Sequence, residues 1–385
     1  MEPKIRLKGF SGEWQNQKLG EIASFSKGSG YSKSDLCDEG NPIILYGRLY
    51  TKYEPVINEV DTFTIPRDGS VYSKGGEVII PGSGETPEDI SIASSVKKAG
   101  VILGGDLNVL SFDSSTHDSA FMAMAVTNSK THKELSKYAQ GKTIVHLHNS
   151  EIAKGAVAIP SLKEQKDIVK FVLTIDSLIQ SATKKMESLK QVKAASLQAM
   201  FPQEGETVPK VRFKGFEGEW YKTIIDNICI KKVSVLSENS LGPNIGNYPV
   251  YGATGYIQNI PTYDIPYQYV GIVKDGSGVG RCQLYPAYSS LLGTMQYILP
   301  KVGYNVAFLA YLFQTLNFSS YINGSSIPHI YFKDYCGQTV YTPTLKEQEL
   351  IANYFQSLDS QITLQSQRVE KLKQIKSACL DQMFV

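Results

Sequence analysis

Two segments of the chain carry apolar residues at alternating spacings of three and four, as helices with one buried face do. Each segment opens with a capping-box pattern, Ser161-Leu-Lys-Glu164 in the first and Thr344-Leu-Lys-Glu347 in the second. The apolar stripes comprise Ile168, Phe171, Ile175, Leu178, Ala182, Leu189 and Val192, and then Ile351, Phe355, Leu358, Ile362, Val369, Leu372 and Cys379. The pattern predicts two helices of about 38 residues each, or roughly 57 Å.

Helices of this length with a narrow apolar stripe need a partner along most of their length. Because both have the same pattern and length, we expect them to pack on each other as an antiparallel coiled coil. The residues expected to pair the helices or to dock a partner are Ile168, Phe171, Ile175, Leu178 and Leu189 in the first, and Ile351, Phe355, Leu358, Ile362 and Leu372 in the second. The alternative is that each helix covers only its own neighbouring domain.

The rest of the chain is rich in strand and turn signals. Short apolar runs bounded by Gly, Pro, Asp or Asn predict strands within 42–47, 77–82, 101–112, 269–276 and 293–300. Only 120–137 and 305–319 look helical among these stretches. The expected fold class is therefore α+β.

The chain also repeats itself. Residues 3–14 (PKIRLKGFSGEW) and 209–220 (PKVRFKGFEGEW) are identical at nine of twelve positions, and the helical segments 160–201 and 343–384 at 18 of 42. A shorter match aligns GKTIVHLHNSE from Gly141 with GSSIPHIYFKD from Gly324. The interiors between these motifs look unrelated, since 16 of the 23 tyrosines lie in 221–341. One repeated frame therefore holds two different inserts.

These boundaries predict five parts. A first strand-rich domain covers 1–159 and a helix covers 160–201, followed by a linker at 202–208. A second strand-rich domain covers 209–342, and a second helix covers 343–385.

Composition excludes several classes of protein. No apolar run reaches the roughly 18 residues that a membrane span needs, so no membrane association is expected. The five cysteines are scattered without a CxxC pair, which argues against disulfides and thiolate metal sites and favours the reducing cytoplasm. A net charge of +2 means that any nucleic-acid binding must rest on local basic surfaces.

Catalytic motifs are not evident. The glycine-rich segment 275–281 lacks the spacing of a phosphate-binding loop, and no adenine-methylating, nuclease or nucleophile motif stands out. His146-x-His148 could suggest a metal, but the second copy has Tyr331 in place of the second histidine. The repeated His146 and His329 are either structural or part of DNA-contacting loops. We expect a non-catalytic chain that binds no metal or cofactor.

With these repeats, the sequence resembles the specificity subunit of Type I restriction-modification systems. The likeness rests on the P-K-[IV]-R-[LF]-K-G-F-x-G-E-W openings, the P-[ST]-L-K-E-Q helix starts and the G-x-[TS]-[IV]-x-H-[LI] segments, and it covers nearly the whole chain. The resemblance implies two target recognition domains, each reading one half of a bipartite, asymmetric site in double-stranded DNA. It implies helices that set the gap between the halves and dock two methyltransferase subunits. Those partners would use S-adenosylmethionine, and a translocating restriction subunit, where present, would use ATP and magnesium.

For such a subunit, polar and basic loop residues are the expected DNA contacts, because they can bind phosphates and base edges. In the first domain the candidates are Arg48, Lys52, Lys74, Ser83, Lys142, Thr143 and His146. In the second they are Tyr256, Lys274, Ser277, Arg281, Ser326 and His329. Surface loops also carry such residues without any function.

Two other readings compete with this one. The chain could be a stand-alone DNA-binding or scaffolding module that self-associates through its helices. A fused methylase-specificity enzyme is less favoured, because the catalytic motifs are missing.

Overall fold

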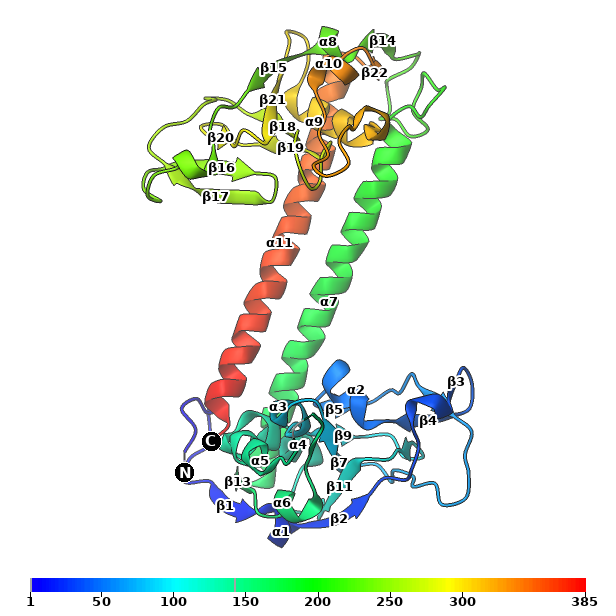
Figure 1. The fold of residues 1–385 in the computed structure, drawn as a ribbon, viewed down its shortest axis with the longest axis vertical. Helices are drawn as coiled ribbons and strands as arrows, with labels where there is room; N and C mark the ends of the chain where they lie inside the picture. Colours follow the sequence, from blue (N-terminus) through cyan, green and yellow to red (C-terminus); the bar gives the residue numbers. More distant parts are fainter. Residues whose placement is uncertain (1, 142) are drawn as a thin grey trace. The chain divides into compact units, whose positions relative to one another are not determined.

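The computed structural model describes residues 2–141 and 143–385 and divides the chain into two compact units (Figure 1). Unit 1 comprises Met1–Ser181 together with Val369–Val385, and unit 2 comprises Ala182–Arg368. Unit 1 is thus assembled from both ends of the chain.

The main sheet of unit 1 has five strands in the order β2-β11-β7-β9-β5, antiparallel except for the parallel pair β9 and β5. Their bounds are β2 Ala23–Lys27, β11 Leu107–Phe112, β7 Glu77–Pro81, β9 Ser94–Val96 and β5 Val56–Ile57. Helix α4 (Ser119–Asn128) packs on β7 and β9 and is buried along most of its length. A helix that is apolar on all sides is expected where it lies between a sheet and other elements.

Smaller elements complete unit 1. A second sheet has the order β10-β4-β6-β3, and β1 pairs with β13 and β12 with β8. The strands are β1 Gln15–Lys18, β3 Leu36–Cys37, β4 Asn41–Ile44, β6 Phe63–Thr64, β8 Ser83–Gly84, β10 Ile102–Leu103, β12 Val145–His146 and β13 Ala156–Ile159. The short helices are α1 Leu19–Ile22, α2 Tyr46–Thr51, α3 Pro87–Ile90, α5 Lys130–Tyr138 and α6 Asn149–Ile152.

Unit 2 is organised around a four-stranded antiparallel sheet in the order β15-β21-β18-β19, with α9 packed on it. These elements are β15 Cys229–Val233, β21 Met295–Pro300, β18 Tyr269–Val273, β19 Cys282–Tyr285 and α9 Val306–Thr315. The remaining elements are β14 Tyr221–Ile224 paired with β22 Thr339–Thr342, the sheet of β16 Tyr248–Gly252, β17 Gly255–Ile260 and β20 Ser290–Leu291, and the helices α8 Ile225–Ile228 and α10 Phe332–Tyr335.

The two inserts share more structure than their sequences suggest. In both units a strand near the start of the insert pairs with a late strand, which pairs in turn with a central buried strand, and one apolar helix covers that sheet. The interiors thus differ in sequence but share this architecture. The physical reason is that an antiparallel sheet requires only alternating burial and turn residues, which many sequences supply.

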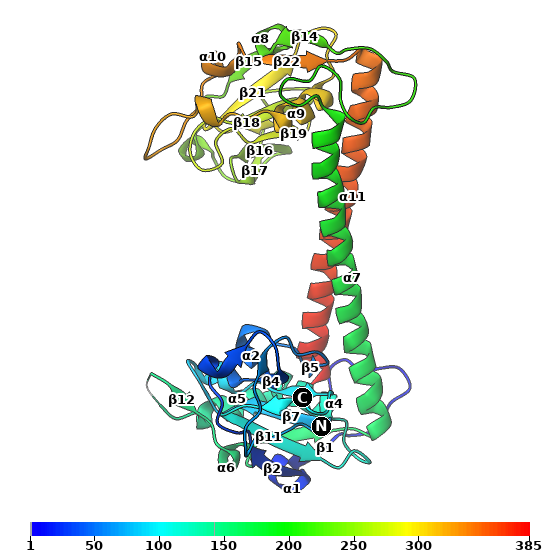
Figure 2. The same ribbon diagram turned by 90° about the vertical axis from the view of Figure 1, so that its right-hand side faces the viewer.

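The two long helices have the predicted positions, since α7 spans Leu162–Met200 and α11 spans Leu345–Met383. In unit 2 they lie side by side in both views (Figure 1 and Figure 2), and Lys193 Nζ lies 2.6 Å from Asp359 Oδ1. Farther along, the hydroxyls of Ser196 and Tyr354 are 2.9 Å apart, so residue numbers rise on one helix as they fall on the other. This antiparallel packing and the α+β class confirm the predicted fold.

Unit 1 contains the repeat-related helix contact. Lys376 Nζ lies 2.6 Å from Asp176 Oδ1. These two residues occupy the positions that Lys193 and Asp359 hold in the aligned copies of the helix. The internal repeat therefore appears in the structure as two equivalent ion pairs, one in each unit.

The repeated sequence at the start of each long helix binds the opening motif of its unit. Ser161 Oγ accepts a 3.4 Å hydrogen bond from Glu164 N, as a capping box predicts. The Glu164 carboxylate instead receives Arg6 Nε at 2.7 Å and Arg6 Nη2 at 2.8 Å. Arg212 and Glu347 repeat this two-point contact at the same distances. The glutamate thus joins the helix to the front motif, because a planar guanidinium matches a carboxylate at two points.

The next residue of the helix motif binds the apolar helix of the insert. Gln165 Oε1 accepts a hydrogen bond from Asp118 N, the N-cap residue of α4, at 2.7 Å. Gln348 Oε1 accepts one from Asn305 N, the N-cap residue of α9, at 3.0 Å. The Glu-Gln pair therefore joins each long helix both to the opening motif of its unit and to the apolar helix of the insert.

Two of the helical predictions change in detail. The stretch 120–137 forms two helices, α4 and α5, because Ser129 ends the first and caps the second through a bond from Thr131 N to Ser129 Oγ (3.2 Å). The stretch 305–319 is helical only as α9, which Asn305 caps by accepting from Phe308 N at 3.0 Å.

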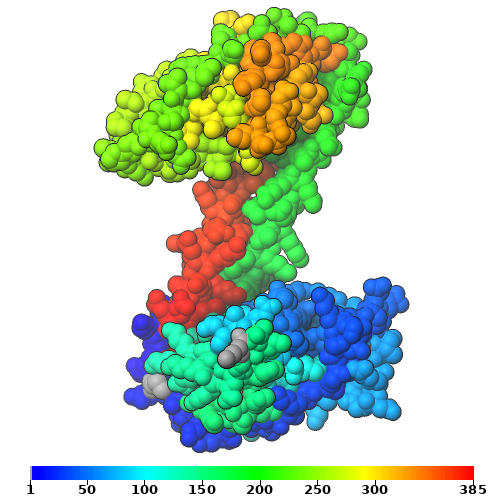
Figure 3. Space-filling view, viewed as in Figure 1, coloured from blue at the N-terminus to red at the C-terminus, as the bar shows by residue number. Residues whose placement is uncertain are grey.

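The hydrophobic core of each unit includes the C-terminal end of one long helix. In unit 1 the ring of Phe384 lies 5.6 Å from that of Phe121, which contacts Trp14 at 5.8 Å. Figure 3 shows the last turn of α11, in red, against this unit. In unit 2 the corresponding ring is Phe201, 5.6 Å from Phe308. Among the described residues, none of the helices is both long enough and apolar enough to cross a membrane.

Candidate functional site

Each unit carries a tight loop built from the repeated Gly-to-His segment. We call these the hairpin loop 140–146 and the hairpin loop 323–329. In the first, Gln140 N donates to His146 O (3.0 Å) and His146 N donates to Gln140 O (2.8 Å). In the second, Asn323 and His329 exchange the same two bonds at 2.9 and 2.8 Å. The repeat in sequence is thus a repeat in backbone structure.

A glycine is required where each loop turns. Gly141 has a φ of 140° and Gly324 a φ of 86°. A side-chain Cβ at Gly141 would overlap the carbonyl oxygen of Ile144, and one at Gly324 would overlap that of Ile327. The retained glycines therefore reflect close backbone packing inside the loops.

The loops are hydrogen-bonded to polar segments far away in sequence. In unit 1, His146 of β12 pairs with Ser83 of β8, and Leu147 N donates to Gly82 O at 3.0 Å. In unit 2, His329 forms a bridge with Asp275. Ile330 N donates there to Lys274 O at 2.9 Å, and Gly276 N donates to Pro328 O at 2.8 Å. The structure thus brings separate candidate residues together on one surface in each unit.

In unit 1 the hairpin loop and the segment it pairs with contain three of the candidate DNA contacts. Thr143 and His146 are exposed, whereas Ser83 is buried and its hydroxyl donates to Asp106 Oδ2 at 2.9 Å. The His146 ring lies parallel to that of His148 at 6.3 Å. Burial lowers the pKa of Lys27, and the negative charge of the nearby Asp106 partly opposes this effect. Lys142 lies outside the described residues.

The surface of unit 2 unites five of the candidates. Ser277, Arg281 and Ser326 are exposed, and Lys274 forms a 3.2 Å ion pair with Asp275. Arg281 donates through Nη2 to the carbonyl oxygen of Ala253, which orients its guanidinium. His329 completes the set through its backbone bonds to Asn323 and Asp275.

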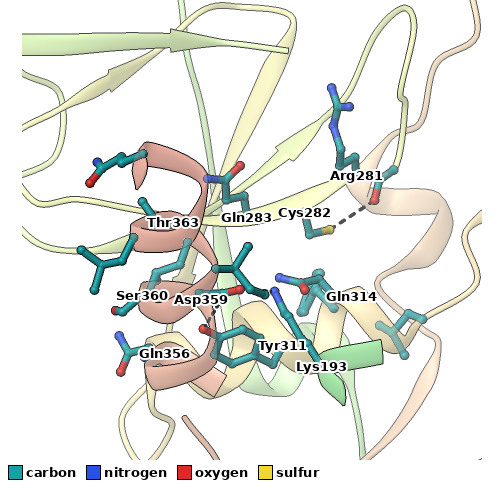
Figure 4. A pocket seen from close by; sticks show the side chains of 17 residues that line it. Lys193, Arg281, Cys282, Gln283, Tyr311, Gln314, Gln356, Asp359, Ser360 and Thr363 are labelled. Atoms are coloured by element: carbon teal, nitrogen blue, oxygen red, sulfur yellow. Dashed lines mark hydrogen bonds and ion pairs between the residues drawn. The ribbon is translucent and has the colours of Figure 1, made fainter. Parts of the chain in front are cut away.

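Arg281 also borders a polar cleft of 950 Å³ between β19, α9 and α11 (Figure 4). Inside it, Asp359 accepts a 2.8 Å hydrogen bond from the Tyr311 hydroxyl and pairs with Lys193. Burial and the adjacent Asp359 carboxylate raise the pKa of Tyr311. Lys193 and Asp359 in the cleft are thus already bound to each other.

Arg48 and Lys52 lie in a different place, at a cleft of 1290 Å³ beside α2. Arg48 is nearly buried and binds Glu54 (2.9 Å) and Asp61, and Lys52 Nζ lies 2.6 Å from Asp61 Oδ2. The hydrogen bonds from Lys52 and Arg48 lower the pKa of the Asp61 carboxyl. Of this pair, Lys52 has the side chain that solvent can reach.

The last two DNA-contact candidates lie apart from the hairpin loops. Lys74 is exposed in the turn before β7, at the end of that strand opposite Ser83. Tyr256 is exposed on β17, in the smaller sheet of unit 2, where its hydroxyl donates to Asn259 Oδ1 at 3.3 Å.

The residues expected to pair the helices or to dock a partner differ in how far they are buried. Ile168, Ile175, Ile351, Phe355 and Leu358 are buried. Phe171, Leu189, Ile362 and Leu372 are partly buried, and Leu178 is exposed. Ile168 belongs to the core of unit 1, and Ile351, Phe355 and Leu358 to that of unit 2. The stripes therefore serve the cores of the units as well as the contact between helices.

Sequence reasoning missed two exposed apolar residues, Ile144 and Ile327, at the tips of the hairpin loops. The alignment of the two Gly-to-His segments already placed them opposite each other. It also missed Asp106 and Lys27, because a contact with a residue some 25 or 80 positions away leaves no local signal.

Among the described residues, no group of three or more His, Cys, Asp or Glu side chains could hold a metal ion.

Comparison with known proteins places these features in one class, the proteins that give DNA-modifying systems their sequence specificity. The family model described as the Type I restriction modification DNA specificity domain matches residues 11–191 and again residues 218–374. The two matches cover most of the chain, and the chain therefore belongs to this family. It is a DNA sequence-specificity subunit with two specificity domains, which is a non-catalytic class of protein.

Solved structures show the same fold. The crystal structure of the Type I restriction-modification S subunit from M. genitalium has a TM-score of 0.69 and 15% identity, covering 100% of this chain and 99% of that one. A structure described as the basis of complex assembly and conformational transition of the type I R-M system has a TM-score of 0.54 and 15% identity, covering 97% and 98%. A search of curated proteins found no match.

Proposed function

We propose that each unit reads one half of a bipartite, asymmetric site in double-stranded DNA. The observation that carries this proposal is the pair of hairpin loops, which are closed by the same two backbone hydrogen bonds but have different neighbours. Ser83, Asp106 and His148 lie beside the first, and Lys274 and Asp275 beside the second. Two similar scaffolds with unlike polar groups suit the reading of two unlike sequences, because base edges are distinguished by their donors and acceptors.

The contact residues follow from this placement. Around the first loop they are Thr143 and His146, with Lys52, Lys74 and Arg48 outside it. Ser83 is buried and would act by holding Asp106. Lys142 is proposed from its place in the sequence alone. Around the second loop the contact residues are Lys274, Ser277, Arg281, Ser326 and His329, with Tyr256 outside it. Lysine and arginine side chains would bind phosphates, and hydroxyls and ring nitrogens would reach base edges. Arg48 would act through Asp61, because its guanidinium is already bound.

We further propose that residues 1–159 and 209–342 are the target recognition domains, and that the helices at 160–201 and 343–385 set the gap between half-sites. The segment 202–208 links the two halves. The unbroken runs of 39 residues in α7 and α11 support this role, since a continuous helix resists bending better than a loop.

The same helices would dock two methyltransferase subunits. This part is supported by the likeness to a structure described in terms of type I complex assembly. Those subunits would carry S-adenosylmethionine and methylate adenine, and a restriction subunit, where present, would add ATP- and magnesium-dependent translocation and cleavage. This chain would supply the recognition of the DNA sequence and would bind no cofactor.

The test is co-expression with a candidate Type I methyltransferase chain from the same genome, followed by mapping of methylated adenines in the host DNA by single-molecule sequencing. The expected result is a split motif with two defined halves and a fixed gap. Exchanging one insert should change one half only. Mass measurement of the complex should find two methyltransferase chains for each copy of this protein.

Two outcomes would contradict the proposal. A protein that elutes alone or as a homodimer, binds DNA and supports no methylation would be the stand-alone module. A methylated motif without a gap would show that the two units do not read separate halves.

A further inference from the structure

Each hairpin loop presents one apolar side chain to solvent. Ile144 is 57% exposed and Ile327 is 67% exposed, and the two are aligned in the repeat. In the same segments Leu147 and its counterpart Ile330 are buried. The repeat therefore retains one apolar position that serves the core and another that does not.

A single exposed isoleucine on a protein surface needs no explanation. Here the same exposure occurs twice, at the same loop position, although most of the surrounding insert differs between the units. Retaining an apolar side chain in water at both positions gives no stability to the folded chain, because the hydrophobic effect rewards only buried area. A contact with another molecule would account for both exposed side chains.

The loops hold these side chains in a defined place. The paired backbone bonds between Gln140 and His146, and between Asn323 and His329, close each loop at its base. The turns at Gly141 and Gly324 then pack against the carbonyl groups of Ile144 and Ile327. A contact group presented on a closed loop loses little conformational freedom on binding.

The groups beside the isoleucines are polar, and they include acidic as well as basic side chains, since Asp275 forms a bridge with His329 and Asp106 accepts from Ser83. Thr143 and Ser326 directly precede the isoleucines, and both are exposed. The second loop is bonded to the segment that carries Lys274 and leads to Arg281, and the first lies beside His146 and His148. An apolar tip beside hydroxyl and imidazole groups, and in unit 2 beside the segment that carries Lys274, suits a DNA groove, where base edges lie between phosphate backbones.

We propose that Ile144 and Ile327 are apolar DNA contacts, each placing its side chain against bases in a groove of its own half-site. Isoleucine is among the side chains that proteins bring into DNA grooves, and thymine methyl groups offer an apolar partner there. This inference rests on the proposed function, because it requires that both units bind DNA. It adds a contact that is common to both units, beside the polar contacts that differ between them.

The test uses the complex with its methyltransferase subunits and a duplex that contains the mapped split site. Ile144→Ala and Ile327→Ala should each weaken binding roughly tenfold, because an apolar side chain can no longer be buried. The slope of log affinity against log salt concentration should not change, since no phosphate contact is removed. Val302→Ala is the matched control, because Val302 is fully exposed in unit 2 outside the loop, and it should bind like the unchanged protein.

The results separate this inference from the proposed function. If the unchanged complex prefers the split duplex and both alanine variants bind it equally well, the isoleucine assignment is overturned and the proposed function stands. If a variant loses its methyltransferase subunits instead, the loop contacts the protein partner and the DNA assignment is wrong. If the unchanged complex binds no DNA, both proposals fail.

Discussion

Arg212 and Glu347 form the contact that joins the opening motif of unit 2 to its long helix. The Glu347 side chain is almost completely buried, and the hydrogen bond to Glu347 raises the pKa of Arg212. A buried carboxylate depends on its cation, because removing one member of such a pair leaves an unpaired charge away from water.

Replacing Arg212 by methionine should therefore lower the free energy of unfolding of unit 2 by about 3–5 kcal/mol. The measurement is urea unfolding followed by the fluorescence of Trp220 in a Trp14→Phe background, since each unit contains one of the two tryptophans. Arg6→Met, at the equivalent position, is the control and should leave the Trp220 transition unchanged. A loss below 1 kcal/mol in Arg212→Met would show that the pair has no structural importance.

At the scale of elements, the two helix ion pairs are equivalent in sequence but differ in their neighbours. Asp176 binds Lys376 in unit 1, while Asp359 binds Lys193 in unit 2 and also accepts from the hydroxyl of the buried Tyr311. A partly exposed ion pair contributes little, whereas a buried hydroxyl that loses its acceptor is costly.

Asp359→Ala should thus destabilise unit 2 by about 1–3 kcal/mol, and Asp176→Ala should destabilise unit 1 by under about 1 kcal/mol. Thermal unfolding of each single-tryptophan variant measures the two effects separately. Equal losses in the two variants would mean that the bond to Tyr311 contributes nothing beyond the ion pair.

At the scale of the whole molecule, unit 1 depends on the end of the chain. Phe384 is buried against Phe121, and Ile5 N donates to Gln382 O at 3.0 Å, so the opening motif and the last residues meet. In unit 2 the same contact, Val211 N to Ala199 O at 2.9 Å, joins residues that are close together along the chain. In unit 2 the contact is thus made within one short stretch of the chain, whereas in unit 1 it joins the two ends of the chain.

Phe384→Ala should destabilise unit 1 by about 3–5 kcal/mol, as large-to-small changes of a buried phenylalanine do. Trp14 fluorescence in a Trp220→Phe background reports this loss. Phe201→Ala should produce the corresponding loss in unit 2 only. An unchanged Trp14 transition in Phe384→Ala would show that unit 1 folds without the chain end.

Much of this organisation could be predicted from local patterns. The spacing of Ile168, Ile175, Ile351 and Leu358 indicated the helices, and the alignment of the copies indicated the two units. Both signals are local or repeated, and a helix needs only the periodicity of its own residues. The family was likewise recognisable, because its motifs are short runs of neighbouring residues.

The contacts that define the candidate site could not be predicted in this way. The sequence alone did not indicate that Glu164 binds Arg6, that Ser83 lies beside His146 and Asp106, or that Ile144 is exposed while Val145 is buried. Such contacts join residues many positions apart, and they depend on which backbone segments the packed core brings together. Periodicity therefore determines which elements form, whereas the packing of those elements determines which side chains meet and which remain exposed.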